Sequence, residues 1–85
     1  MQADHKKAHH QLNIARGQLD GISKMMEEDA YCLDISNQLL ATIALLKKLN
    51  YDILDAHLAH CVSCAEGEEK AEKLKEISAV LKRLS

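Results

Sequence analysis

Apolar residues recur along most of the chain at intervals of three and four positions, the spacing that gathers them on one face of an α-helix. The first such segment follows Asp4, a residue suited to a helix N-cap, and predicts a helix over residues 4–28. Two further segments predict helices over residues 33–64 and 68–84. No segment alternates with the period of two that indicates a strand. The pattern therefore predicts an all-α fold of three helices in one domain, residues 1–85.

The first predicted helix has a narrow apolar seam. Its apolar positions are spaced alternately by four and three residues, as in helices that pack side by side. They are Ala8, Leu12, Ala15, Leu19, Ile22 and Met26. We expect this seam to lie against one side of the second helix.

The second predicted helix is too long and too broadly apolar for a monomer. About 30 residues at a rise of 1.5 Å make a rod of roughly 45 Å, which is longer than a compact domain of this size is wide. Its apolar positions cover more than one stripe, and the first helix can cover only one side. We therefore expect a second copy of the chain to cover the rest, in an antiparallel helical-bundle homodimer.

Composition and charge narrow the class of protein. The formal net charge is −2, which by itself argues against a nucleic-acid binder, but basic side chains concentrate in residues 1–26 and acidic ones in residues 27–61. The chain lacks an apolar signal-peptide core and any run of about 18 apolar residues. We therefore expect a cytoplasmic protein that does not enter a membrane and whose three cysteines are reduced unless its function uses them.

Groups that bind soft metals lie at the two ends of the second predicted helix. Cys32 lies at its start, whereas His57 and Cys61 lie near its end, four positions apart and so on one face. Along an intact helix these two ends are roughly 38–44 Å apart, so one chain cannot bring the groups together. In an antiparallel dimer, Cys32 would meet His57 and Cys61 of the partner subunit. Two thiolates and one imidazole suit Cu(I), or Zn(II) if a fourth ligand joins them.

Other cysteines and histidines have simpler interpretations. Cys64 forms CVSC with Cys61, without the second pair of a zinc site or the βαβ context of a thioredoxin-like motif, and we expect it to be a bystander. We expect His5, His9 and His10 to be solvated, although an N-terminal histidine could complete a nickel-type site. Even Cys32 could be a small buried side chain without chemistry. No nucleophile and base have a third, orienting group, so an enzyme is not expected.

Two stretches of the sequence resemble a known family. ARGQLDGISKMMEEDAYCLDISNQLLA, followed by LLKKLNYDILDAHLAHCV, is similar to the CsoR/RcnR family of bacterial metal-sensing transcriptional repressors. The resemblance runs from about Lys7 to Leu84 and includes RGQLDGI, DAYC-D and HLxHC in order. It implies a three-helix protomer whose antiparallel dimer assembles into a tetramer. It also implies a repressor that leaves its operator DNA, and so derepresses metal-export genes, when metal binds.

The resemblance also implies roles for single residues. The metal ligands of the copper-sensing branch match Cys32, His57 and Cys61, and the presence of His57 with both cysteines favours Cu(I). A Tyr and a Glu that link the ligand histidine to DNA release match Tyr31 and Glu76. The basic residues expected to contact DNA are Lys6, Lys7, Arg16 and Lys48, with Lys24 and Lys47 as weaker candidates.

Three alternatives remain at this point. On the same scaffold, the signal could be a persulfide or another thiol oxidant that links Cys32 and Cys61 across the dimer without any need for His57. The metal could be nickel, bound by the same three residues. A protein of another class, a structural helical bundle or a copper buffer, would have no DNA role at all.

Overall fold

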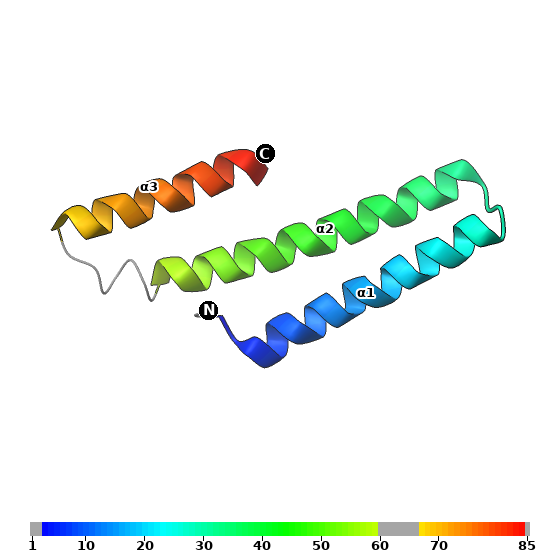
Figure 1. Ribbon diagram of the computed structural model, residues 1–85, viewed down its shortest axis with the longest axis horizontal. Coiled ribbons are helices and arrows are strands. Elements are labelled where there is room, and N and C mark those ends of the chain that lie inside the picture. Colours follow the sequence, from blue (N-terminus) through cyan, green and yellow to red (C-terminus); the bar gives the residue numbers. More distant parts are fainter. Residues whose placement is uncertain (1–2, 60–66, 85) are drawn as a thin grey trace.

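The computed structural model describes residues 3–59 and 67–84, and three helices make up most of them (Figure 1). Helix α1 spans His5–Glu27, α2 spans Cys32–His57 and α3 spans Gly67–Leu84. No strand occurs within the described ranges. The predicted all-α fold with a three-helix protomer is confirmed.

The ends of α1 follow from local sequence. The side chain of Asp4 accepts hydrogen bonds from the backbone N–H groups of Lys6 and Lys7, at 3.0 and 3.2 Å, and so satisfies two of the donors that a helix start leaves free. At the other end, Asp29 adopts a positive φ of 55°, a conformation that Asp tolerates better than most residues. The chain reverses there, and α1 and α2 form an antiparallel hairpin.

The predicted boundaries are close for α1 and α3 and differ for α2. The α-helical part of α2 ends at His57, seven residues before the predicted end, and the backbone widens into a π-helical turn at Leu58 and Ala59. The N–H of Leu58 bonds to the carbonyl oxygens of both Leu54 and Asp55, so an i to i−3 bond is added there to the regular i to i−4 bond. The rest of the predicted helix, residues 60–64, lies outside the described residues.

The core of the chain is the seam between α1 and α2, and it differs from the predicted seam. The α1 residues that are buried or half-buried are Ala8, Gln11, Ala15, Gln18, Ile22 and Met25. Three of the six predicted seam residues, Leu12, Leu19 and Met26, are instead 41–57% exposed. Helix α1 is thus rotated about its axis relative to the prediction, with two glutamines facing inwards where leucines were expected.

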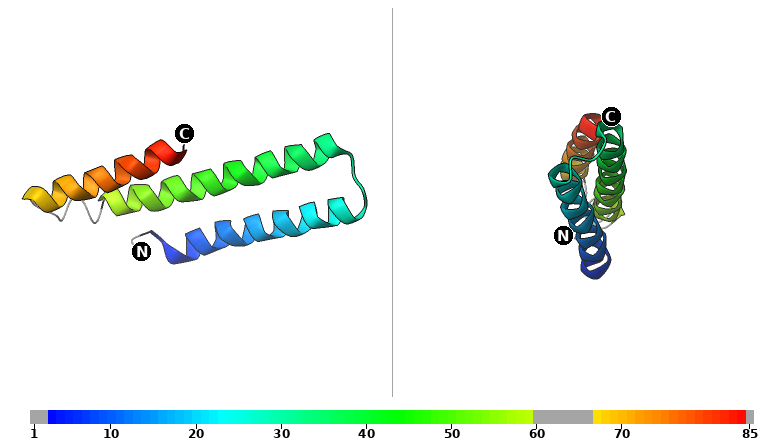
Figure 2. Two further views of the ribbon diagram at one scale, coloured as in Figure 1. Left: turned by 45° about the horizontal axis from the view of Figure 1, so that its top comes forward. Right: turned by 90° about the vertical axis from the view of Figure 1, so that its right-hand side faces the viewer.

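The C-terminal part of α3 lies beside the C-terminal end of α2, and the start of α3 extends beyond that end (Figure 2). Ile77 is its buried residue. Together with Leu81 it lines a groove against Tyr51, Leu54 and Leu58 of α2.

The molecule is a single layer of helices. Its extents are 56 × 26 × 12 Å, and the shortest is the diameter of about one helix with its side chains. The radius of gyration is 17.0 Å, against about 12 Å for a compact domain of this length. Such a layer cannot bury both of its faces by itself. Within the described ranges, no helix combines the length and hydropathy of a membrane span.

Candidate metal centre

Cys32 is the first residue of α2, and its thiol is free and exposed. The residue before it, Tyr31, is the N-cap: its backbone is extended, and its carbonyl oxygen accepts from the N–H groups of Asp34 and Ile35 at 3.0 and 3.2 Å. The Tyr31 side chain makes no capping hydrogen bond and is exposed. Both side chains are therefore available at the surface beside the turn.

His57 ends the α-helical part of α2 and is half-buried. It follows Cys32 by 25 positions, which brings it within about 20° of a whole number of helical turns. The two side chains thus project from the same side of α2, at opposite ends of a rod. Cys61 lies outside the described residues.

Exposed apolar side chains connect these two ligand candidates. Leu39, Ile43 and Leu46 project from the same side of α2 between Cys32 and His57 and are 38–47% exposed. We call these five residues the ligand stripe. An apolar stripe with a different metal ligand at each end is self-complementary under a two-fold axis, because antiparallel packing pairs each end with the other.

The structure does not bring the predicted ligands together within one chain. Among residues 3–59 and 67–84, no group of three or more His, Cys, Asp or Glu side chains is close enough to hold a metal ion. This agrees with the expectation from helix length, since Cys32 and His57 lie at opposite ends of α2 (Figure 1). Within one chain, Cys32 and His57 are therefore too far apart to bind the same metal ion.

Tyr31 and Glu76, expected to link to the ligand histidine, lie on different elements. Tyr31 precedes α2 and is at the far end of that helix from His57. Glu76 is exposed on α3 and directly precedes Ile77, which packs near Leu58 at the His57 end of α2. Within one protomer, Glu76 is therefore nearer to the end of α2 that carries His57, whereas Tyr31 lies at the opposite end.

The predicted DNA-contacting residues are all exposed. Lys6, Lys7 and Arg16 belong to α1, and Lys48 belongs to α2. Lys24, a weaker candidate, is 4.0 Å from Glu28 in an exposed i, i+4 ion pair, which partly offsets its charge and contributes little to stability.

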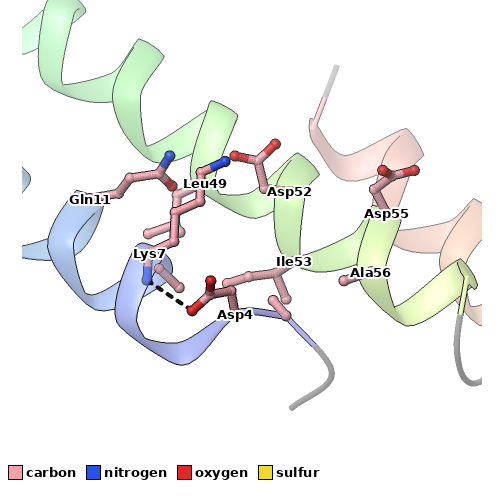
Figure 3. Close-up of a pocket in the computed structure, with 10 residues that line it drawn as sticks. Asp4, Lys7, Gln11, Leu49, Asp52, Ile53, Asp55 and Ala56 are labelled. Carbon is pink, nitrogen blue, oxygen red and sulfur yellow. Dashed lines mark hydrogen bonds between the residues drawn. The ribbon is translucent and has the colours of Figure 1, made fainter.

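A cavity of about 250 Å³ lies between the start of α1 and the second half of α2 (Figure 3). Its polar lining comes from Asp4, Lys7, Gln11, Asp52 and Asp55. No sequence pattern indicates this group, because its members lie on two helices and share no motif. Ala56 also lines the cavity, so the start of α1 lies beside the end of α2 that carries His57.

The sequence matches a known family over nearly its whole length. Residues 4–83 match the family described as "Metal-sensitive transcriptional repressor". The chain belongs to this family, whose members are transcriptional repressors, and the expectation that it is not an enzyme is confirmed by that membership.

Its relatives include sensors of copper. The chain is 43% identical over 76 residues to the copper-sensing transcriptional repressor RicR of Mycobacterium tuberculosis H37Rv, with 86% of this chain and 79% of that protein covered. It is 46% identical over 60 residues to the copper-sensing transcriptional repressor CsoR of Mycobacterium ulcerans, a match that covers 71% of this chain and 51% of that relative. The chain thus spans about half the length of that CsoR.

The fold also matches a solved structure. The crystal structure of the copper-sensing repressor CsoR with Cu(I) from Geobacillus thermodenitrificans NG80-2 superposes with a TM-score of 0.80 at 34% identity, covering 92% of this chain and 82% of that one. The resemblance to the copper-sensing branch, inferred from sequence motifs, is confirmed.

Proposed function

We propose that this chain is a Cu(I)-responsive transcriptional repressor, which binds operator DNA when metal-free and releases it when Cu(I) binds between two subunits. One observation carries the proposal: the ligand stripe places Cys32 and His57 on one side of α2, at its two ends. The family and its copper-sensing relatives support the same reading.

The proposed metal site is formed by Cys32 of one protomer with His57 and Cys61 of the partner subunit. Two thiolates and an imidazole form a soft ligand set that fits Cu(I). Two-fold symmetry gives each dimer two such sites. Each chain, a single domain of residues 1–85, therefore provides Cys32 to one metal ion of the dimer. It provides His57 and Cys61 to the other metal ion.

The shape of the chain supports the dimer. The accessible surface is 6472 Å², whereas a compact protein of this mass exposes roughly 5,000 Å². The excess is more than the roughly 800 Å² that each partner buries in an interface of standard size. The exposed apolar side chains of α1 and of the ligand stripe supply that surface, and we propose that two such dimers associate into a tetramer.

The proposed operator surface consists of the exposed basic residues Lys6, Lys7, Arg16 and Lys48. Neutralisation of phosphates by such side chains makes the affinity for DNA fall steeply with salt concentration.

Cu(I) weakens DNA binding if it binds the DNA-free conformation better, and DNA then weakens Cu(I) binding by the same factor. Tyr31 and Glu76 are proposed to link His57 to that change, since a metal-bound imidazole offers its second nitrogen to a neighbour. Such a repressor acts in the cytoplasm.

The test is an anaerobic Cu(I) titration of the reduced protein against a competing chelator, followed by operator binding on the DNA upstream of its own gene. We expect one tightly bound Cu(I) per protomer and loss of the DNA complex at that stoichiometry. His57→Ala should weaken Cu(I) binding, whereas His9→Ala, which removes an exposed imidazole on α1, should not. Weak Cu(I) binding that the chelator reverses, or no operator binding, would contradict the proposal.

A thiol-sensing repressor on the same scaffold is the second candidate, because the Cys32 thiol is exposed. A persulfide that links Cys32 and Cys61 across the dimer does not use the imidazole of His57. If the wild-type protein released DNA in response to persulfide but not to Cu(I), and His57→Ala kept the persulfide response, this second candidate would replace the first. Release by Ni(II) in place of Cu(I) would identify a nickel sensor.

A further inference from the structure

The most deeply buried polar side chain among the described residues is Thr42, in the middle of α2. It is 1% exposed. Its hydroxyl group lies 2.8 Å from Oε1 of Gln18 on α1 and 3.1 Å from the carbonyl oxygen of Gln38, one turn earlier in α2. A hydroxyl has one proton to donate, so Gln18 competes with the local backbone for it. The hydrogen bond between Thr42 and Gln18 is therefore a polar link between the two helices inside their seam.

This link coincides with the unexpected rotation of α1. Gln18 faces α2, and the adjacent Leu19, whose burial the apolar pattern predicts, is 49% exposed. Burying an apolar side chain is worth about 1.5–3 kcal/mol, so within one protomer a seam of apolar contacts alone would favour Leu19 on the inside. With Thr42 opposite, that arrangement would leave a buried hydroxyl without its partner on α1. A buried polar pair that fixes how helices align, at some cost in apolar burial, is known from coiled coils.

The steric features of α1 near this point do little to fix its rotation. Gly17 and Gly21 flank Gln18 and have no side chains, and a Cβ atom added to either would meet nothing within 4 Å. The buried residues one turn before and one turn after Gln18 are Ala15 and Ile22. Both belong to the seam whether Gln18 or Leu19 faces α2, so they do not select between these two rotations. A hydrogen bond depends strongly on direction, and so it can select one rotation where these residues cannot.

The rotation of α1 determines where Arg16 points. Arg16 and Gln18 are two positions apart, about 200° around the helix, and therefore project from opposite sides. Gln18 is half-buried against α2, and Arg16 is exposed. We propose that the hydrogen bond between Thr42 and Gln18 sets the rotation of α1 and thereby directs Arg16 away from α2. Thr42 and Gln18 are positioning residues for the operator surface, and this second part of the inference rests on the proposed function.

The first test measures rotation and does not depend on DNA binding. Thr42→Val removes the hydroxyl and keeps the side-chain shape, and Thr42→Ser keeps the hydroxyl as a control. NOE contacts from the methyl group of Thr42 in the wild-type protein, and from the β-protons of residue 42 in Thr42→Ser, should place this residue against the side chain of Gln18. In Thr42→Val, residue 42 should instead contact the methyl groups of Leu19. Unchanged contacts to Gln18 in Thr42→Val would overturn the proposal.

The second test is a double-mutant cycle on operator affinity with metal-free protein, at concentrations where sedimentation shows one assembly state for all variants. Thr42→Val should weaken operator binding about threefold to tenfold, within the range for coupled residues. In an Arg16→Ala background it should have no further effect, while its effect on thermal stability persists. An equal loss in both backgrounds would show a general structural effect and overturn the positioning role. Absence of operator binding by the wild-type protein would contradict the proposed function and leave the NOE result standing.

Discussion

The two sides of α2 differ in how much of their apolar surface a single chain can bury. The side that faces α1 is closed: Thr42 and Leu49 are buried, and a hydrogen bond crosses to Gln18. The side with the ligand stripe is open, with apolar side chains in solvent and a proposed metal ligand at each end. The first side holds the protomer together, and we propose that the second packs against another copy. A single helix would then serve both folding and assembly, in agreement with an apolar pattern that is broader than one seam needs.

The largest expected effect is on the open side and concerns Cu(I). Cys32→Ala should weaken Cu(I) binding by orders of magnitude, and so should His57→Ala, because each removes one of three proposed ligands. Mixing the two variants should restore tight binding, since a heterodimer pairs the intact Cys32 of one chain with the intact His57 and Cys61 of the other. Chelator competition on the unfolded and refolded mixture measures this. A mixture that binds no better than the separate variants would exclude a site shared between subunits.

The next effect concerns assembly through the ligand stripe. Ile43→Glu places a carboxylate in the middle of this stripe and should raise the dimer dissociation constant about a hundredfold or more, because an interface would have to bury an unpaired charge. Asn37→Glu, an exposed change elsewhere on α2, is the matched control. Sedimentation velocity over a range of concentrations measures both. A fully dimeric Ile43→Glu protein would show that the copies meet on another surface.

A core substitution tests the closed side. Leu49→Ala removes a buried side chain from the seam and should lower the free energy of unfolding by about 2–5 kcal/mol. Leu40→Ala, at a site that is 60% exposed in the protomer, should cost less. Denaturant unfolding at several protein concentrations separates folding from assembly, because only losses at a subunit interface change with concentration. If Leu40→Ala lowered the free energy of unfolding more than Leu49→Ala does, Leu40 would lie in an extensive interface. The open side of α2 would then contribute more to stability than the closed side.

The smallest effect is at the start of α1. Asp4→Ala removes the side chain that caps the N–H groups of Lys6 and Lys7 and should cost about 0.5–2 kcal/mol. Asp4→Asn keeps an acceptor oxygen and should cost less. Amide hydrogen exchange in the first turn of α1 reports the fraying directly. Equal exchange in all three proteins would mean that the cap does not hold this end.

Much of the fold could be predicted because its signals are local. The periodicity of apolar residues indicated three helices, and Asp4 indicated the start of the first. The distance between Cys32 and His57 along one helix also follows from residue spacing alone, and so does the need for a second copy to complete the proposed site. The π-helical turn at Leu58 and Ala59 was not predicted, since it has no marker such as Pro or Gly in the sequence.

Contacts between residues three and four positions apart determine which segments are helical, so these segments can be read from the sequence. The regular geometry of a helix likewise puts Cys32 and His57 on one side of α2. The rotation of α1, in contrast, depends on how the helices pack. Apolar periodicity favoured Leu19 for the seam, and the structure placed Gln18 there, opposite Thr42. That choice depends on a hydrogen bond between residues 24 positions apart, and a contact between helices leaves no period in the sequence of either helix.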